Sequence, residues 1–140
     1  MKTSNIQPYL FFGGRCEEAL DFYRAAIGAQ IDLLMRYKES PEPLPPDRIP
    51  PGFENKIMHT TFRIGGSTLM ASDGCAEGAN FAGFSLHICF PTVAEVDRAF
   101  AALAAGGKVE MPPVKTFWSP RFGMLTDKFG IGWMVSVASE

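Results

Sequence analysis

Residues 116–137 of this chain read TFWSPRFGMLTDKFGIGWMVSV. Two apolar runs in this stretch flank the residues DKFG at 127–130, where Asp and Gly favour a tight turn. The stretch therefore predicts a β-hairpin. A shorter version, MHTTFRIGGSTLMAS, lies at residues 58–72 and has a Gly-Gly pair at its centre. The chain thus contains the same local design twice.

The segment before the shorter hairpin predicts a strand, a helix and a second strand. Residues 6–12 are an apolar and aromatic run that ends at a Gly-Gly pair, as a short strand does. Residues 15–27 place their apolar side chains on one helical face, and Gly28 ends the helix. Residues 30–37 then predict a strand that leads toward the hairpin.

The segment before the longer hairpin repeats this order. Residues 84–90 alternate between apolar and polar side chains, which predicts a half-buried strand. Thr92 and Glu95 have the spacing of a capping box at the start of a helix, and residues 108–114 predict a strand interrupted by two prolines. In residues 84–90, one face carries Phe84, Leu86, Ile88 and Phe90, and the other carries Ser85, His87 and Cys89.

Both halves therefore have the order strand, helix, strand, strand, strand. The sequence predicts an α+β fold of two tandem βαβββ modules, at about residues 5–73 and 83–138, within a single domain of residues 1–140. One module alone leaves a sheet face and an edge uncovered, whereas two modules together can bury both. We expect the cupped mixed sheets to surround a cleft in which a ligand binds.

Residues 38–55 break this pattern, since they contain six prolines. Proline fixes φ and removes a backbone donor, so this segment is neither a helix nor a central strand. A loop of this length in a compact domain is usually either a lid over a site or a mobile loop that extends from the surface. Residues 73–82, which are rich in Gly and Ala, predict the linker between the modules.

The composition excludes several classes of protein. A chain of 140 residues with 46% hydrophobic and 20% charged residues is typical of one globular domain. The net charge of −2, without a basic stripe, argues against a nucleic-acid partner, and no apolar run is long enough to span a membrane. The first residues lack a small-residue cleavage site, so we expect a strand there rather than a signal peptide. Three widely spaced cysteines favour free thiols in a reducing cytoplasm.

Four stretches resemble the PhnB-like branch of the vicinal oxygen chelate superfamily, which includes glyoxalase I, bleomycin-resistance proteins and extradiol dioxygenases. They are PYLFF at 8–12, EEALDFYRAAIGA at 17–29, KIMHTTFRIGGSTLMASD at 56–73 and FWSPRFGMLTDKFGIGWMVSV at 117–137. Together they span nearly the whole chain. The resemblance implies the duplicated fold, and it implies a homodimer because many relatives pair their modules across a two-fold axis.

Members of this branch often carry a label as ubiquinone-pathway methyltransferases. A methyl donor such as S-adenosylmethionine needs a Gly-rich turn between a parallel strand and a helix of a doubly wound sheet. The pair Gly13-Gly14 is the only candidate for such a turn, and the chain does not alternate strands and helices. Methyltransferase activity is therefore not expected.

In metal-using members of the superfamily, four ligands come from equivalent strands of the two halves. The corresponding positions in this chain are Gln7, Met70, Ser85 and Met134. Only Gln7 offers a donor that a hard divalent ion prefers, so no metal or other cofactor is predicted. A shift of two residues on one strand would replace Ser85 by His87, which leaves a divalent-metal site of Gln7, His59 and His87 as the alternative.

Two histidines and three further residues are the candidates for a site. His59 and His87 are the candidate general acid/base residues, because imidazole titrates near neutral pH. His59 also has a structural interpretation, as a hydrogen-bonded strand residue near the surface. Tyr37, Ser85 and Trp118 are candidates for contacts with the ligand, Trp118 by stacking.

Three other residues have a structural interpretation. Asp127 is expected to serve the hairpin turn and Trp133 the core. Cys89 is expected to be a small core residue rather than a nucleophile, since no neighbouring base or helix N-terminus is evident.

The predicted function is small-molecule binding in the cleft, without a catalytic metal, by a cytoplasmic homodimer of unknown specificity. Whether the protein also catalyses a reaction stays open at this point. One alternative is a divalent-metal-dependent enzyme of the glyoxalase or lyase type. The other is a sequestering protein like those that confer bleomycin resistance, in which aromatic side chains hold a planar drug.

Overall fold

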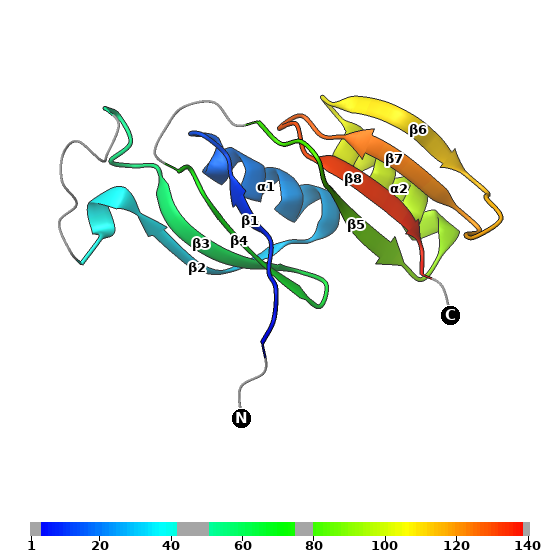
Figure 1. Cartoon of the computed structure of the whole chain (residues 1–140), viewed down its shortest axis with the longest axis horizontal. Coiled ribbons are helices and arrows are strands. Elements are labelled where there is room, and N and C mark those ends of the chain that lie inside the picture. Colours follow the sequence, from blue (N-terminus) through cyan, green and yellow to red (C-terminus); the bar gives the residue numbers. More distant parts are fainter. Residues whose placement is uncertain (1–3, 42–50, 75–79, 139–140) are drawn as a thin grey trace. The chain divides into compact units, whose positions relative to one another are not determined.

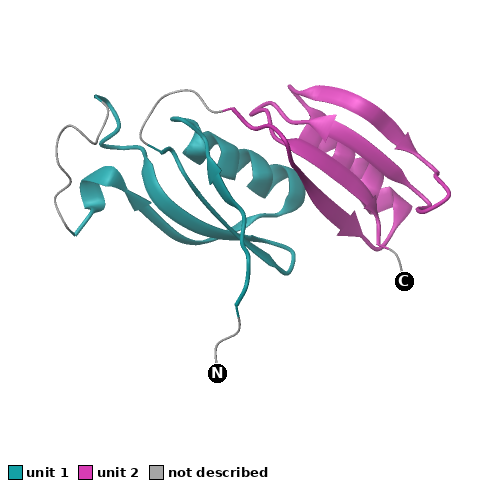
Figure 2. Ribbon diagram, in the orientation of Figure 1, with its two compact units in different colours: residues 1–79 teal, residues 80–140 magenta. Residues whose placement is uncertain are grey.

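The chain divides into two compact units, residues 1–79 and residues 80–140 (Figures 1 and 2). The structure, a computed structural model, describes residues 4–41, 51–74 and 80–138. In its described residues each unit contains one α-helix and one four-stranded mixed sheet. The predicted duplication of a βαβββ module is therefore confirmed.

The first unit has its sheet strands in the order β1-β4-β3-β2. Strand β1 is parallel to β4, and the other neighbouring strands are antiparallel. Strand β1 is shorter than the sequence predicted, and a 3-10 helix follows β2. The elements are β1 (Tyr9–Phe11), α1 (Cys16–Ile27), β2 (Gln30–Arg36), the 3-10 helix (Tyr37–Glu39), β3 (Ile57–Ile64) and β4 (Ser67–Ser72).

The second unit repeats this topology, with the order β5-β8-β7-β6 and with β5 parallel to β8. The two prolines predicted to interrupt a strand lie in β6, which is an edge strand and shows irregular pairing with β7. An edge strand tolerates proline because its outer N–H groups need no partner in the sheet. The elements are β5 (Ser85–Phe90), α2 (Val93–Ala104), β6 (Lys108–Val114), β7 (Phe122–Thr126) and β8 (Gly132–Val137).

The helix ends follow the predicted signals. Gly28 ends α1 in the left-handed conformation, with φ of 72°, and its N–H donates to the carbonyl of Arg24. Thr92 caps α2, because its hydroxyl accepts from the backbone N–H of Glu95 and also donates to the Glu95 carboxylate. These caps set where each helix begins or ends relative to its sheet.

The helix of each unit covers one face of its own sheet (Figure 1). In the first unit the buried side chains are Leu10, Phe62, Leu69 and Ala71 from the strands with Leu20 and Tyr23 from α1. In the second unit they are Leu125, Trp133 and Val135 with Val96, Phe100 and Leu103 from α2. The predicted core position of Trp133 is confirmed. We call the sheet face opposite the helix the open face of that unit.

Two buried aspartates organise backbone N–H groups in the two units. The Asp73 carboxylate accepts from the N–H groups of Gly14, Cys16 and Ile57. The Asp127 carboxylate accepts from the N–H groups of Phe129 and Ile131 and from the indole N–H of Trp133. The turn role predicted for Asp127 is confirmed, and the same carboxylate also anchors the core tryptophan.

Some sequence predictions fall partly outside the described residues. The proline-rich segment 38–55 and the linker 73–82 include residues 42–50 and 75–79, which are not described, and the latter range contains Cys75. In the described part of the proline-rich segment, Phe53 is buried and its ring lies 6.4 Å from that of Tyr37. No helix among the described residues is long and apolar enough to cross a membrane.

Candidate functional site

Three polar side chains meet on the open face of the second unit. The register of β5 and β8 places Cys89 opposite Ser136 and His87 opposite Met134. His87 Nε2 lies 2.8 Å from Ser136 Oγ and 3.7 Å from Cys89 Sγ. Cys89 Sγ lies 3.6 Å from Ser136 Oγ, so the three atoms form a closed triangle. We call His87, Cys89 and Ser136 the polar cluster.

An array of aromatic side chains adjoins the polar cluster. The ring of Phe122, on β7, lies 6.3 Å from His87 and 5.4 Å from Trp118, with edge-to-face geometry in both pairs. Phe117 in turn lies 4.7 Å from Trp118. The Trp118 side chain is 53% exposed and that of Phe117 is 97% exposed. We call Phe117, Trp118 and Phe122 the aromatic array.

The loop between β6 and β7 holds Trp118 in place through hydrogen bonds of its neighbours. The N–H of Thr116 donates to the carbonyl of Ser119, and the N–H of Ser119 donates to the Thr116 hydroxyl. The buried Ser119 hydroxyl donates to the carbonyl of Arg121, whose guanidinium pairs with Asp97 of α2 at 3.0 Å. Local hydrogen bonds therefore hold the loop residues on both sides of Trp118.

The open face of the first unit also combines a histidine with aromatic side chains. His59 Nδ1 lies 3.3 Å from the Tyr9 hydroxyl, and His59 Nε2 lies 3.3 Å from the Thr61 hydroxyl. The Tyr9 ring lies 5.0 Å from that of Phe11 and 5.9 Å from that of His59. Both ring nitrogens of His59 thus have partners, as in the structural interpretation of this residue.

The predicted site residues separate into three groups. Ser85, His87 and Trp118 belong to the second unit, where the structure brings His87 and Trp118 to the same aromatic side chain. Gln7 precedes β1 and His59 lies on β3, both in the first unit. Tyr37 is buried, with its hydroxyl donating to the carbonyl of Gly74, so it stands in the core of the first unit rather than on an exposed face.

Sequence reasoning missed two members of the polar cluster. The prediction that Cys89 is a core residue is wrong, because its side chain is exposed. The available signal was the spacing of His87 and Cys89, since residues two apart on a strand share a face. Ser136 could not be found in this way, because its place depends on the pairing of β5 with β8.

The side chains at most of the positions implied for a metal site are poor ligands for a hard divalent ion. No three side chains of His, Cys, Asp or Glu come together in the part of the chain that the structure describes. Of the positions that the resemblance implied, Ser85 lies opposite Gly132, and Met134 lies opposite His87. A thioether beside one imidazole does not match the nitrogen and charged oxygen donors that Zn²⁺ or Mg²⁺ prefers.

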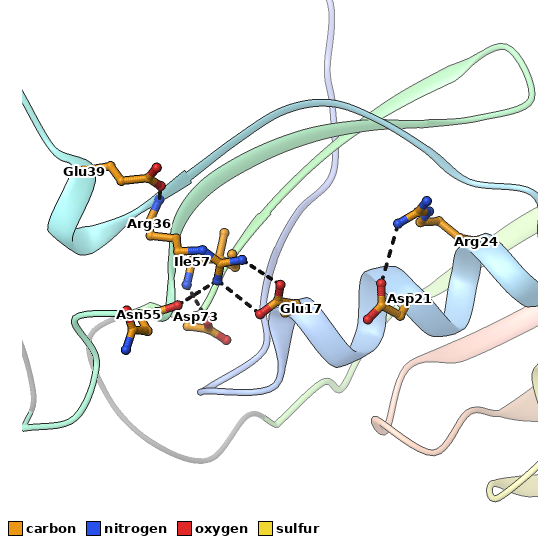
Figure 3. A network of polar contacts seen from close by, with 8 residues as sticks. All are labelled: Glu17, Asp21, Arg24, Arg36, Glu39, Asn55, Ile57 and Asp73. Atoms are coloured by element: carbon orange, nitrogen blue, oxygen red, sulfur yellow. Dashed lines mark hydrogen bonds and ion pairs between the residues drawn. The ribbon is translucent and has the colours of Figure 1, made fainter.

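A hollow of about 480 Å³ lies beside the start of α1. Figure 3 shows the contacts of Arg36 with Glu17 and Asn55 in this region. Its polar groups bind one another: Arg36 contacts Glu17 at 2.6 Å and the carbonyl of Asn55 at 2.8 Å, and Lys56 donates to the carbonyl of Gly14. The hydrogen bond from Arg36 lowers the pKa of Glu17. The lining residues are Gly14, Glu17, Glu18, Asp21, Arg36, Asn55, Lys56 and Asp73. These contacts tie α1 to β2 and join the segments that precede α1 and β3, which is a structural role.

Known proteins match the chain over nearly its whole length. The profile of the family described as 3-demethylubiquinone-9 3-methyltransferase matches residues 4–136. Protein YjdN of Escherichia coli strain K12 is 37% identical over 141 residues, covering 96% of both chains. The crystal structure of protein PA1353 from Pseudomonas aeruginosa is 37% identical with a TM-score of 0.83, covering 99% of this chain and 100% of that one. A Bacillus cereus structure, described as a putative 3-demethylubiquinone-9 3-methyltransferase, PhnB protein, is 32% identical with a TM-score of 0.78, covering 96% and 100%.

Two tandem βαβββ modules define a protein with the vicinal oxygen chelate fold. A glyoxalase-related enzyme from Fulvimarina pelagi (16% identity, TM-score 0.64, 97% of this chain and 89% of that one) shares this fold. So does the fosfomycin resistance protein FosX from Listeria monocytogenes (12% identity, TM-score 0.63, 99% and 96%). Within this superfamily the chain belongs to the PhnB-like family, the one described as 3-demethylubiquinone-9 3-methyltransferase. The resemblance seen in the sequence is confirmed.

Proposed function

We propose that this protein binds a planar, partly apolar small molecule on the open face of the second unit. The observation that carries the proposal is the aromatic array beside the polar cluster, in which Phe117 and Trp118 are exposed and Phe122 is buried beneath them in the sheet. When a flat ligand stacks on exposed aromatic side chains, apolar surface of both partners is removed from water, which favours binding. Neighbouring polar atoms then fix the orientation of the ligand. Trp118 supplies the stacking surface, and His87 and Ser85 supply hydrogen-bonding groups.

Any chemistry at this site uses the protein's own side chains in our proposal, without a catalytic metal. His87 Nε2 faces the polar cluster and the ring is exposed, so a bound molecule can exchange a proton with it. The exposed position of His87 supports a role as a general acid or base. The same position also suits a protein that only sequesters its ligand, in which case the ligand leaves unchanged.

Methyl transfer, which the family's description names, is not part of the proposal. The turn that would have to receive the carboxylate of a methyl donor such as S-adenosylmethionine is Gly13-Gly14, ahead of α1. The N–H groups of Gly14 and Cys16 already donate to the buried Asp73 carboxylate, at 2.9 and 2.7 Å. An anionic group at this helix start would have to displace that carboxylate, and like charges repel there.

Binding of 8-anilinonaphthalene-1-sulfonate, an aromatic probe with a flat naphthalene ring, tests the proposal. Trp118→Ala should weaken binding of the probe about tenfold, because loss of an aromatic contact costs roughly 1–1.5 kcal/mol. Phe84→Ala is the matched control, since Phe84 is also an exposed aromatic residue of the second unit, and it should leave binding within about twofold. Equal affinity of wild type and Trp118→Ala would contradict the proposal.

The same titration after dialysis against a chelator separates the metal-dependent alternative. Retained binding of the probe supports the metal-independent site. A stoichiometric divalent ion in the purified protein, together with loss of binding on chelation, would instead favour an enzyme of the glyoxalase or lyase type.

A further inference from the structure

We propose that Cys89 is a nucleophile that captures planar electrophiles of the α,β-unsaturated carbonyl class as covalent thioethers. The proposal rests on the proposed function, because the aromatic array is what brings a planar molecule to the thiol. It goes beyond that function in naming a reactive atom and a class of ligand.

The surroundings of Cys89 are those of a usable thiol. The side chain is exposed on β5, which is an edge strand of its sheet. A base, His87 Nε2, lies 3.7 Å from the sulfur, and the Ser136 hydroxyl lies within hydrogen-bonding distance of both atoms. Since the thiolate is the nucleophile, a neighbouring imidazole that can take the proton promotes attack.

Ser136 gives the polar cluster a second path for the proton. Its side chain is only 4% exposed, so its hydroxyl is held against the other two members rather than against water. The hydroxyl can accept from Cys89 while donating to His87, and it can donate to the sulfur once the proton has moved. Two donors then face the sulfur anion, which stabilises it.

Cys16 shows the opposite environment in the same chain. It is fully buried at the start of α1, close to the Asp73 carboxylate. Desolvation, and secondarily the negative charges of Asp73 and Glu17, raises the pKa of the Cys16 thiol far above its ordinary value. This thiol is therefore an internal negative control for reactivity.

The covalent step is a conjugate addition that needs no further reactant. The proton of Cys89 Sγ moves to His87 Nε2, directly or through the Ser136 hydroxyl. The sulfur electron pair forms a C–S bond to the β-carbon, and the π electrons move to the α-carbon and carbonyl oxygen. The imidazolium then returns the proton to the α-carbon, so one S–H bond has added across one C=C bond.

The neighbouring side chains favour a conjugated, planar electrophile. Phe122 is a neighbour of both His87 and Trp118, so the base and the stacking surface are next to the same ring. A flat molecule stacked on Trp118 is thereby held beside the polar cluster. Holding two reactants together raises their effective concentration, so aromatic substituents on the electrophile should speed the reaction.

The test uses the full chain carrying Cys75→Ser, with N-phenylmaleimide and N-ethylmaleimide as probes and intact mass as the readout. We expect one adduct, which maps to Cys89 and disappears in Cys89→Ser. His87→Asn should slow alkylation at neutral pH about tenfold or more, since general bases contribute at least this much. Ser136→Ala is the second variant and should also slow the reaction. Rates with N-acetylcysteine correct for the intrinsic reactivity of each probe.

Two outcomes separate this proposal from the proposed function. Wild-type alkylation rates in both His87→Asn and Ser136→Ala, or an adduct that maps to Cys16, would overturn the covalent proposal while leaving binding of the aromatic probe intact. Slow alkylation in His87→Asn, without any preference for the phenyl probe and without an effect of Trp118→Ala, would support the activated thiol and overturn the aromatic binding site.

Discussion

Among single residues, the two buried aspartates, Asp73 and Asp127, each accept several hydrogen bonds that hold the surrounding backbone in place. Asp127 Oδ1 accepts from two backbone N–H groups and Oδ2 accepts from the indole of Trp133, at 2.8 Å. A carboxylate can satisfy all three donors because it only accepts. An amide of the same shape has to turn one N–H toward a donor. A carboxylate is therefore required at this position, because an asparagine of the same shape cannot accept all three hydrogen bonds.

Asp127→Asn should lower the free energy of unfolding by about 1–3 kcal/mol, since at least one buried donor loses its acceptor. Urea unfolding at neutral pH measures this change. Asp97→Asn is the control, because Asp97 forms an exposed ion pair with Arg121, and it should cost no more than about 1 kcal/mol. Equal stability of Asp127→Asn and wild type would contradict the requirement for a carboxylate at this position.

The residues that could be predicted are those whose role depends on neighbours in the sequence. Asp127 was found because its turn is local, and Trp133 because it lies in an apolar strand. Tyr37 was not, because only the tertiary fold shows that Phe53 and the Gly74 carbonyl surround it. Ser136 was not, because strand register decides its partners. Side-chain roles that depend on long-range pairing lie beyond the reach of local pattern.

Among the elements, the turn between α2 and β6 approaches the end of β7 so closely that Gly107 has no space for a side chain. A Cβ on Gly107 would lie 2.2 Å from the carbonyl oxygen of Thr126 and within 3 Å of backbone atoms of Asp127. Backbone atoms cannot turn away as a flexible side chain can. The connection therefore needs glycine for space, without any need for a left-handed conformation.

Gly107→Ala should lower the free energy of unfolding by about 2 kcal/mol or more, as other overpacked sites do. Gly66→Ala is the matched control: it lies in the turn between β3 and β4, and a Cβ there meets no atom within 4 Å. That variant should be neutral or slightly stabilising, through the lower entropy of the unfolded chain. Thermal and urea unfolding of both variants test this, and equal effects would refute the steric explanation.

The order of the elements was predictable because hydrophobic periodicity distinguishes helices from strands and because the two halves of the chain share the same order. Helix ends were predictable from Gly28 and Thr92. Strand lengths were less so: β1 covers only Tyr9–Phe11 of the expected run 6–12, since pairing with β4 sets its extent. The two prolines of β6 are accommodated because it is an edge strand, and edge position is a property of the sheet rather than of the segment.

At the scale of the whole molecule, each unit buries one sheet face under its helix and leaves aromatic or apolar side chains on the open face. On the first unit these include Phe11, 56% exposed, and Leu33, 49% exposed. The duplicated sequence predicted the fold because two copies of one pattern are a strong signal. Ligand identity did not follow, because families with this fold place different side chains on the same strands.

The exposed side chains of the first unit's open face lead to a last prediction, that the protein is a homodimer in solution. Apolar side chains gathered on one sheet face are typical of an interface, and a two-fold pair buries the same patch on both copies.

Sedimentation velocity at micromolar concentration should show a dimer. The double variant Phe11→Ser, Leu33→Ser should raise the dissociation constant at least about tenfold, as loss of two buried apolar side chains implies. Ile6→Ser, at a fully exposed residue ahead of β1, should leave the dimer unchanged. A wild-type monomer at that concentration, or equal dissociation of all three proteins, would mean that this face serves another purpose.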